Sequence, residues 1–399
     1  MGITSMNEIL LILILKKMRT KHLFLAMTAL LVAGCTQNEV LQTPPTEGQE
    51  IGFGIYTGVQ TKGTETTTAE IQKLSKGFGI FAYLHNKATT NATDYQTYMD
   101  NVQVTYDGTS VWKYSPLKYW PTDADATGGS EKNLLDFYAY APYNAQGVTF
   151  DLTAAGTPKL KFEVQAATGL KDMPDLVVAE AQKDMHKGAS SVTSNSGKVS
   201  FTLKHILSKV AMQVKTSKDL SGNGQTKIYL TKVEIEHKSK LHNKGTYDMT
   251  AAMSSGAWTY GSTFIASPYD LSNIMNLTSV KYANYTKDKA IDITANPDGV
   301  SLFQQDECLY FLPEASWTND DVTVKFSYDV VVKANDAATT ATKYSVVKAV
   351  NLPIDATASV GFKKGQAYLY KFTIGLDAIE VKADVTAWGT PSSPSDITL

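Results

Sequence analysis

The chain has 399 residues, of which 43% are hydrophobic and 19% charged, and its formal net charge at pH 7 is −2. The length suffices for two domains that each have a core, while the nearly balanced charge excludes a strongly basic nucleic-acid-binding protein. Two cysteines build neither a disulfide framework nor a four-thiolate zinc site. Arg19 is the single arginine, so beyond it no arginine fork can hold a phosphate, and we expect no phosphate-handling enzyme.

Residues 1–34 have the pattern of a secretory signal peptide. A basic segment, Met18-Arg-Thr-Lys-His, precedes an apolar run from Leu23 to Ala33. That run is too short to span a bilayer, which takes about 20 apolar residues, but it suits the apolar region of a signal. Met18 alone would begin a conventional signal, so we expect the true start there.

Small residues precede a cysteine at the end of this run, in Val32-Ala33-Gly34-Cys35. This is the lipobox pattern of bacterial lipoproteins, in which the signal is cut between Gly34 and Cys35 and the cysteine carries acyl chains such as palmitate. Several acyl chains hold a protein stably on a membrane. Since Thr36, and not an aspartate, follows the cysteine, we predict a lipid anchor in the outer membrane.

Polar residues 35–50, which include Pro44-Pro45 and Gly48, have the composition of a tether. From residue 51 onward, apolar and polar residues alternate with period two, which is typical of strands with one buried face. Such strands form antiparallel sheets that pack face to face, so we expect an all-β fold of antiparallel β-sandwiches. Strands are predicted at Ile51, Phe53 and Ile55, and over residues 78–83, 136–142, 201–214, 325–333, 368–374 and 379–387.

Irregular features of the pattern are few. Within the predicted strand 201–214 the alternation changes phase, which predicts a β-bulge near Ser208. Periodicity of 3.6 residues is scarce, and the helical candidates are the short segments 67–74 and 271–275.

A stretch rich in Ser, Gly and Asn, from Gly188 to Gly197, separates two strand-rich halves. Such low-complexity stretches are typical of connections between domains. We therefore predict an N-terminal β-sandwich domain over residues 51–198 and a C-terminal one over residues 199–399.

Aromatic side chains cluster in Trp112-Lys-Tyr-Ser-Pro-Leu-Lys-Tyr-Trp-Pro121, a segment that contains two prolines. If Trp112, Tyr114, Tyr119 and Trp120 were exposed on one face, sugar rings could stack on them. If they are buried, they pack between strands, and this is the preferred interpretation because Tyr and Trp fill cores with one polar partner each. The exposed arrangement predicts a surface glycan-binding lipoprotein as the alternative function.

Residues with catalytic or metal-binding chemistry show no familiar spacing. The six histidines are scattered, and His237 and His242 are five residues apart, which places them on opposite faces of one strand. The sequence has neither a glycine-rich phosphate loop before a helix nor a Gly-x-Ser-x-Gly elbow. We expect no catalytic residue, no metal and no cofactor.

Taken together, several segments resemble the fimbrillin family, the lipoprotein pilins and pilus-associated proteins of Bacteroidales type V pili. The most distinctive is Phe201-Thr-Leu-Lys-His205-Ile-Leu-Ser-Lys209-Val, which is similar to the family's Phe-x-x-x-His-x-Leu-x-Lys/Gln-Val segment. The order and spacing of further segments agree over most of the mature chain. They are Ile51-Gly-Phe-Gly with Thr61-Lys62-Gly63, Phe78-Gly-Ile-Phe-Ala-Tyr83, Tyr119-Trp120-Pro121, Phe137-Tyr-Ala-Tyr-Ala-Pro142, Asp175-Leu-Val-Val-Ala179, Tyr310-Phe-Leu-Pro313, Gly365-Gln-Ala-Tyr368-x-Tyr370 and Val381-x-Ala-x-Val385-x-x-Trp388.

The resemblance implies two tandem transthyretin-like β-sandwich domains and no catalysis. It also implies a structural role as a fimbrial subunit or pilus-associated lipoprotein of the outer membrane that serves cell adhesion. In the family, a protease cuts after a basic residue that follows the first strand, and a strand of the next subunit replaces that strand, by donor-strand exchange. The implied partners are other fimbrial subunits, in a homo- or heteropolymer, and surface glycans or proteins of host or bacteria; nucleic acid is not among them.

Carried over to this chain, the cut falls between Lys62 and Gly63, and the displaced strand contains Ile51, Phe53 and Ile55. The family usually has arginine at the cut, so this chain requires a protease that accepts lysine. Otherwise the chain stays uncut and membrane-bound, as an anchor or accessory subunit.

The C-terminal strand is the candidate donor because it is apolar on one face and lies near the chain end. It equally suits the role of completing its own sheet. Stalk, tip and anchor roles are all compatible with the sequence. The candidate donor residues are Ile379, Val381, Val385 and Trp388.

Overall fold

β-strands prevail in the computed structural model, and most of them pair antiparallel, as the alternation predicts. Within the described residues the strands form four sheets, and no helix there is long and apolar enough to cross a membrane. The structure describes residues 48–57, 68–73, 76–86, 94–122, 124, 132–217, 220, 224–251, 257–294, 298–304, 307–314, 317–318, 320–352, 361–375 and 379–387.

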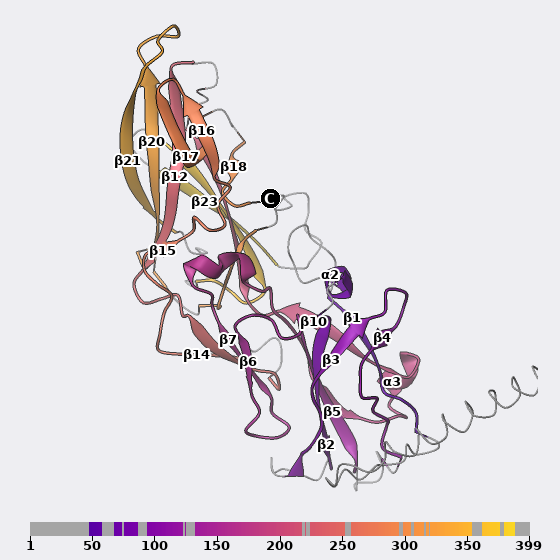
Figure 1. Ribbon diagram of the computed structural model, residues 1–399. Coiled ribbons are helices and arrows are strands. Elements are labelled where there is room, and N and C mark those ends of the chain that lie inside the picture. The colour runs from indigo at the N-terminus through magenta and orange to yellow at the C-terminus, as the bar shows by residue number, and fades with distance from the viewer. Residues whose placement is uncertain are drawn as a thin grey trace, which may run out of the picture. The chain divides into compact units, whose positions relative to one another are not determined.

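The first sheet has the strand order β1-β10-β8-β5-β2-β3-β4, with β9 paired to β5 (Figure 1). Two of its strands, β2 and β5, have almost continuously apolar sequences, and both are buried on both faces. Phe81 and Tyr138 point into one core cluster, and Ile80 and Phe137 into the other. The strands are β1 (Gly52–Tyr56), β2 (Phe78–His85), β3 (Gln96–Tyr106), β4 (Trp112–Lys113), β5 (Leu134–Ala141), β8 (Val177–Ala179), β9 (Gln182–Met185) and β10 (Lys198–His205).

Two further sheets come from the C-terminal part of the chain. One has the order β18-β11-β22-β23, with β19 paired to β11, and the other β16-β17-β12-β20-β21, with β15 paired to β12. The first of them consists of β11 (Ser208–Thr216), β18 (Val300–Ser301), β19 (Leu309–Phe311), β22 (Gln366–Ile374) and β23 (Ile379–Ala387). The second consists of β12 (Thr226–His237), β15 (Tyr269–Asp270), β16 (Thr278–Tyr282), β17 (Tyr285–Asp292), β20 (Val322–Lys333) and β21 (Ala341–Asn351).

The fourth sheet joins strands from both sides of the predicted domain boundary between residues 198 and 199. Its order is β14-β13-β7-β6, and its strands are β6 (Val148–Asp151), β7 (Lys159–Glu163), β13 (Lys244–Asp248) and β14 (Trp258–Tyr260). One core cluster likewise contains buried side chains from both halves, such as Phe162 and Tyr247. The predicted boundary itself stays a prediction.

Short helices occupy few of the described residues: α2 (Thr68–Lys73), the 3-10 helix η2 (Ala167–Asp172) and α3 (Ser190–Ser194). The candidate over residues 67–74 is thereby confirmed as α2, with Ile71 as its buried residue. The candidate at 271–275 is wrong, since that segment forms turns. Helix α3 lies inside the low-complexity stretch, where composition indicated only a connection.

The predicted bulge near Ser208 is also wrong. Strand β10 ends at His205, and the chain enters a different sheet as β11 at Ser208. The two residues between these strands, Ile206 and Leu207, are both buried. The phase change in the alternation therefore marks the passage from one sheet to another, and not an extra residue within one strand.

Candidate functional site

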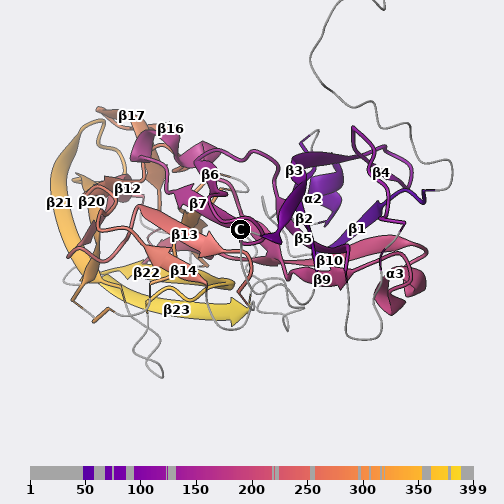
Figure 2. The same ribbon diagram turned by 90° about the horizontal axis from the view of Figure 1, so that it is seen from below.

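Strand β1 carries the residues predicted to be displaced, and it lies at the end of the first sheet. It pairs in parallel with β10, in a register that runs from Gly52 opposite Lys198 to Tyr56 opposite Thr202. Both ribbon views draw the two strands side by side (Figures 1 and 2). The parallel direction was not evident from the sequence, because alternation reports a buried face and not a neighbour.

Residues 49–51, directly before β1, pair with the segment that follows β4. The amide of Ile51 donates to the carbonyl of Lys118 at 2.9 Å, and the amide of Trp120 donates to the carbonyl of Gln49 at 2.9 Å. Glu50 and Tyr119 form an antiparallel bridge between these two segments. The stretch from Gln49 to Tyr56 therefore has two backbone partners, the segment around Tyr119 for residues 49–51 and β10 for residues 52–56.

The Tyr114 hydroxyl strengthens the contact between residues 49–51 and the segment after β4. It donates to the carbonyl of Ile51 at 2.8 Å and accepts from the amide of Lys118 at 3.3 Å. Burial raises the pKa of Tyr114 to about 12, so the hydroxyl keeps its proton and remains a donor. A single side chain thus joins Ile51 to the segment that follows β4.

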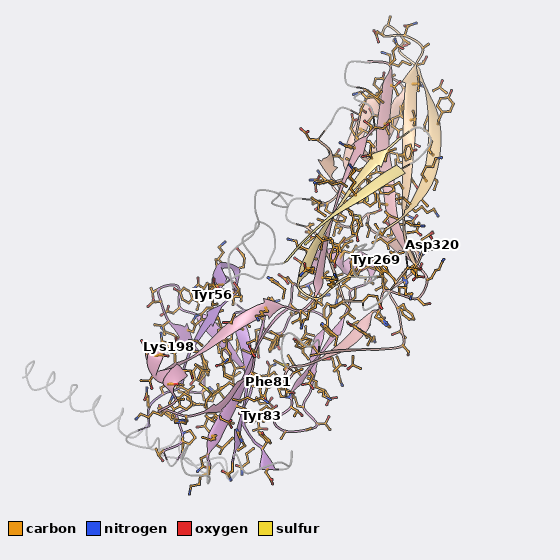
Figure 3. All side chains as sticks on the ribbon, turned by 180° about the vertical axis from the view of Figure 1, so that it is seen from behind. Tyr56, Phe81, Tyr83, Lys198, Tyr269 and Asp320 are labelled. Atoms are coloured by element: carbon orange, nitrogen blue, oxygen red, sulfur yellow. The ribbon has the colours of Figure 1, made fainter. Side chains whose placement is uncertain are left out.

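The inward side chains of β1 fill the core beneath the sheet. The Phe53 ring is 1% exposed, and its centroid lies 5.3 Å from that of Tyr114, 5.9 Å from Phe137 and 6.2 Å from Phe201. Ile51 is fully buried and Ile55 half-buried. Tyr56, at the end of the strand, is 55% exposed, and Figure 3 labels it together with Lys198 of β10.

Hydrogen bonds between two threonines bring together the ends of the segment that contains the predicted cut. The Thr57 amide donates to Thr68 Oγ1 at 3.0 Å, and the Thr68 amide donates to Thr57 Oγ1 at 2.6 Å. Residues 58–67, with Lys62 and Gly63, lie outside the described residues. The signal cleavage and lipidation residues Gly34 and Cys35 lie outside them too.

The four aromatic residues of the alternative sugar platform lie next to β1. Trp120 is 2% exposed and Tyr114 is buried, so neither ring can stack on a sugar. Trp112 and Tyr119 are half-buried, and the Trp112 ring packs against Phe78 with centroids 5.0 Å apart. Tyr114 and Trp120 belong to the core cluster that contains Phe53, and Trp112 packs against it.

The predicted donor strand, β23, lies at the end of its own sheet. It pairs antiparallel with β22 along its full length, from Ile379 opposite Ile374 to Ala387 opposite Gln366. Val385 is 38% exposed, and Trp388 lies outside the described residues. In this structure β23 completes its own sheet, which is the alternative that the sequence left open.

One polar cluster escaped the sequence analysis because its members lie far apart in the chain. The imidazole Nε2 of His85 in β2 lies 3.0 Å from Asp136 Oδ1 in β5 and 3.6 Å from Asp184 Oδ1 in β9. Asp136 Oδ1 also accepts the Asp184 amide at 2.9 Å. Three such ligand atoms could hold a metal ion, but these contacts already explain the cluster as a buried His–Asp pair that joins three strands.

This pair predicts a specific pH dependence of stability. Burial alone would lower the pKa of His85, but the hydrogen bond to Asp136 and its charge outweigh burial and raise that pKa above 6.5. Stabilisation by the protonated imidazole is therefore full below about pH 6.5 and declines as the pH rises through the folded-state pKa. We expect the difference in urea midpoint between the wild type and His85→Gln to shrink from pH 6 to pH 8.

The difference between the two proteins is the quantity to measure, because His237 acts in the opposite sense. Burial lowers the pKa of His237, and its contribution to stability grows as the pH rises. That contribution is common to the wild type and to His85→Gln and cancels in the comparison. A difference that stayed constant from pH 6 to pH 8 would contradict the His85 prediction.

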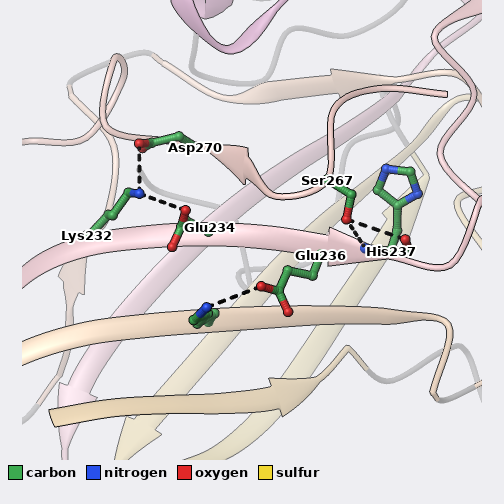
Figure 4. Close-up of polar contacts among 7 residues, drawn as sticks. Lys232, Glu234, Glu236, His237, Ser267 and Asp270 are labelled. Atoms are coloured by element: carbon green, nitrogen blue, oxygen red, sulfur yellow. Dashed lines mark hydrogen bonds and ion pairs between the residues drawn. The ribbon is translucent and has the colours of Figure 1, made fainter.

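Two surface hollows adjoin polar side chains. One, of about 310 Å³, adjoins His237 and Ser267, which make their mutual hydrogen bonds through the His237 backbone and not its imidazole (Figure 4). The nearby Lys232 forms ion pairs with both Glu234 and Asp270. The other hollow, of about 520 Å³, covers the four-stranded sheet and contains a Lys244–Glu163 ion pair. Because the Ser267 hydroxyl contacts the backbone of His237 and not its imidazole, these two residues do not form a nucleophile–base pair.

Comparison with known proteins agrees with this architecture. The sequence model of the fimbrillin-like family matches residues 64–388. The chain is similar to fimbrium subunit Fim1C of Phocaeicola vulgatus, with 34% identity over 405 aligned positions that cover 96% of this chain and 100% of the relative. It is also similar to a fimbrial protein of Bacteroides vulgatus of known crystal structure, with a TM-score of 0.68, 28% identity, and coverage of 85% of this chain and 99% of the other.

Proposed function

Because the chain belongs to the fimbrillin-like family, we propose that it is a fimbrial subunit that assembles by strand addition after loss of its own strand β1. Relatives with fimbrial names support a structural role at the cell surface, and no catalytic step is part of the proposal. The cut falls after Lys62, in the segment that directly follows β1. Cys35 carries the lipid anchor in the outer membrane, and residues 35–50 form the tether.

The observation that carries this proposal is that the stretch from Gln49 to Tyr56 has two backbone partners. β10 pairs with β1, and the segment of Lys118 to Trp120 pairs with residues 49–51, directly before β1. Removal of this stretch leaves hydrogen-bonding groups unpaired in both partners and exposes the aromatic side chains around Phe53. An extended segment of another subunit would restore both, since an added strand supplies main-chain hydrogen bonds and alternate side chains.

Strand addition of this kind accounts for a polymer. The groove and the donated strand are different parts of the subunit, so each contact is heterologous, and heterologous contacts that do not close form filaments. β23 is the candidate donor, and it must leave β22 to reach another subunit. Cell adhesion follows as the role of the fimbrium. We do not propose the sugar platform, because Tyr114 and Trp120 are buried.

The maturation step is tested by replacing Lys62. Wild-type protein released from the cell surface is expected to begin at Gly63 and to form SDS-resistant ladders. Lys62→Ala is expected to leave chains that begin at acylated Cys35 and to abolish the ladders, because β1 stays attached and fills its own groove. Mass spectrometry of the native N-terminus measures lipidation and cleavage together.

Lys76→Ala is the matched control, since Lys76 is an exposed lysine that follows α2 closely. This variant should mature like the wild type. Wild-type chains that all begin at acylated Cys35 would contradict cleavage and favour an uncut anchor or accessory subunit.

A further inference from the structure

The surroundings of the Phe53 side chain differ from those of its neighbours on β1. Rings from three separate segments surround it: Tyr114 after β4, Phe137 of β5 and Phe201 of β10. The interplanar angles of 58°, 71° and 25° are tilted, edge-on and stacked arrangements. Aromatic pairs prefer such geometries and gain stability beyond that of the buried area.

Each wall of this pocket is itself fixed by the fold. Phe137 is buried in β5, which pairs with β2 and β8. Phe201 is buried in β10, which pairs with β8 as well as with β1, and the Tyr114 hydroxyl is hydrogen-bonded to Lys118 as well as to Ile51. A smaller side chain in place of Phe53 would leave a cavity, because close-packed walls relax only in part. The pocket is thus shaped for one planar ring.

We propose that this pocket selects the incoming strand: it admits a segment of another subunit that carries an aromatic side chain at the position of Phe53. The inference rests on the proposed strand addition and adds to it the chemistry of the partner. At the flanking positions the side chain of the incoming strand matters less, since Ile55 is only half-buried and Tyr56 is exposed.

The pocket discriminates against the C-terminal strand of the same chain. The alternating apolar positions of β23 carry aliphatic side chains alone, and Trp388 is out of phase with them. A copy of β23 would therefore place an aliphatic side chain among the three rings and underfill the pocket. The favoured partner is a different subunit, so the assembly is a heteropolymer at this junction. The aliphatic residues of β23 are Ile379, Val381, Ala383, Val385 and Ala387.

Synthetic strands test the proposal without altering the protein core. A site for a sequence-specific protease replaces residues 60–65, the folded protein is cut, and exchange of β1 is measured with a fluorescent peptide of residues 49–59. Unlabelled competitors are that peptide, its Phe53→Leu and Phe53→Ala forms, and a peptide of residues 377–390. The Tyr56→Ala peptide is the matched control.

The Phe53→Ala peptide should compete at least about 100-fold more weakly than the parent, from the cost of a lost buried Phe. The Phe53→Leu peptide should be about tenfold weaker, because apolar area remains but ring contacts are lost. The 377–390 peptide should be at least about tenfold weaker than the parent, because it too offers an aliphatic side chain and no ring, and the Tyr56→Ala peptide should equal the parent. Equal competition by the parent and the Phe53→Ala peptide would contradict selection of an aromatic side chain but not strand addition. Failure of every peptide to exchange would contradict strand addition as well.

Discussion

Replacing Phe53 by alanine in the intact chain is expected to lower the free energy of unfolding by about 3–5 kcal/mol, the usual cost of deleting a buried phenylalanine. The ring is 1% exposed and packs against Tyr114, Phe137 and Phe201, so its removal leaves a cavity with fixed walls. Urea unfolding of the protein that is not cut at Lys62 and keeps β1, followed by tyrosine and tryptophan fluorescence, measures the change.

Tyr56→Ala on the same strand is the control. Tyr56 is 55% exposed, and exposed substitutions usually change stability by no more than about 0.5 kcal/mol. A loss for Phe53→Ala as small as that for Tyr56→Ala would show that β1 contributes little to the folded precursor. The groove beneath it would then not depend on a strand.

Replacing His205 by alanine is expected to lower the free energy of unfolding by about 3–5 kcal/mol, because it removes a partner from a buried charged group. His205 Nδ1 lies 2.9 Å from Asp175 Oδ1, and the Asp175 side chain is fully buried. The pair lies where the chain leaves the first sheet: the neighbouring Ile206 donates its amide to Leu176 and accepts the indole N–H of Trp258. Thermal and urea unfolding measure the loss.

Asp175→Asn is the matched control for this pair. The amide has nearly the same volume and keeps an oxygen that can accept the imidazole N–H, so a loss of only about 1–2 kcal/mol is expected. If His205→Ala were no more destabilising than Asp175→Asn, the pair would not act as a buried charged interaction. The fimbrillin-like segments around Asp175 and His205 would then need another explanation.

Local features of the fold were accessible from the sequence. Alternation at Ile51, Phe53 and Ile55 identified a strand with one buried face, and the structure buries Ile51 and Phe53. The short helix α2 was also foreseen. Each of these features depends on residues within a few positions of one another, which is the range that a pattern can report.

Long-range pairing was not accessible in the same way. The phase change at Ser208 was interpreted as a bulge, yet it marks the passage from β10 to β11 in another sheet. No alternating pattern predicts the antiparallel bridge between Glu50 and Tyr119. His85, Asp136 and Asp184 come together from three strands, and no spacing in the chain connects them.

The sequence by itself determined that this is an all-β protein with fimbrillin-like segments, because side-chain alternation and short motifs are encoded locally. Only the tertiary structure decided that β1 pairs with β10, that residues 49–51 pair with the segment from Lys118 to Trp120, and that Phe53 fills a pocket of three rings. The physical reason is that the apolar face of a strand can pack against many different neighbours. Packing and backbone pairing across the whole chain determine which neighbour it has.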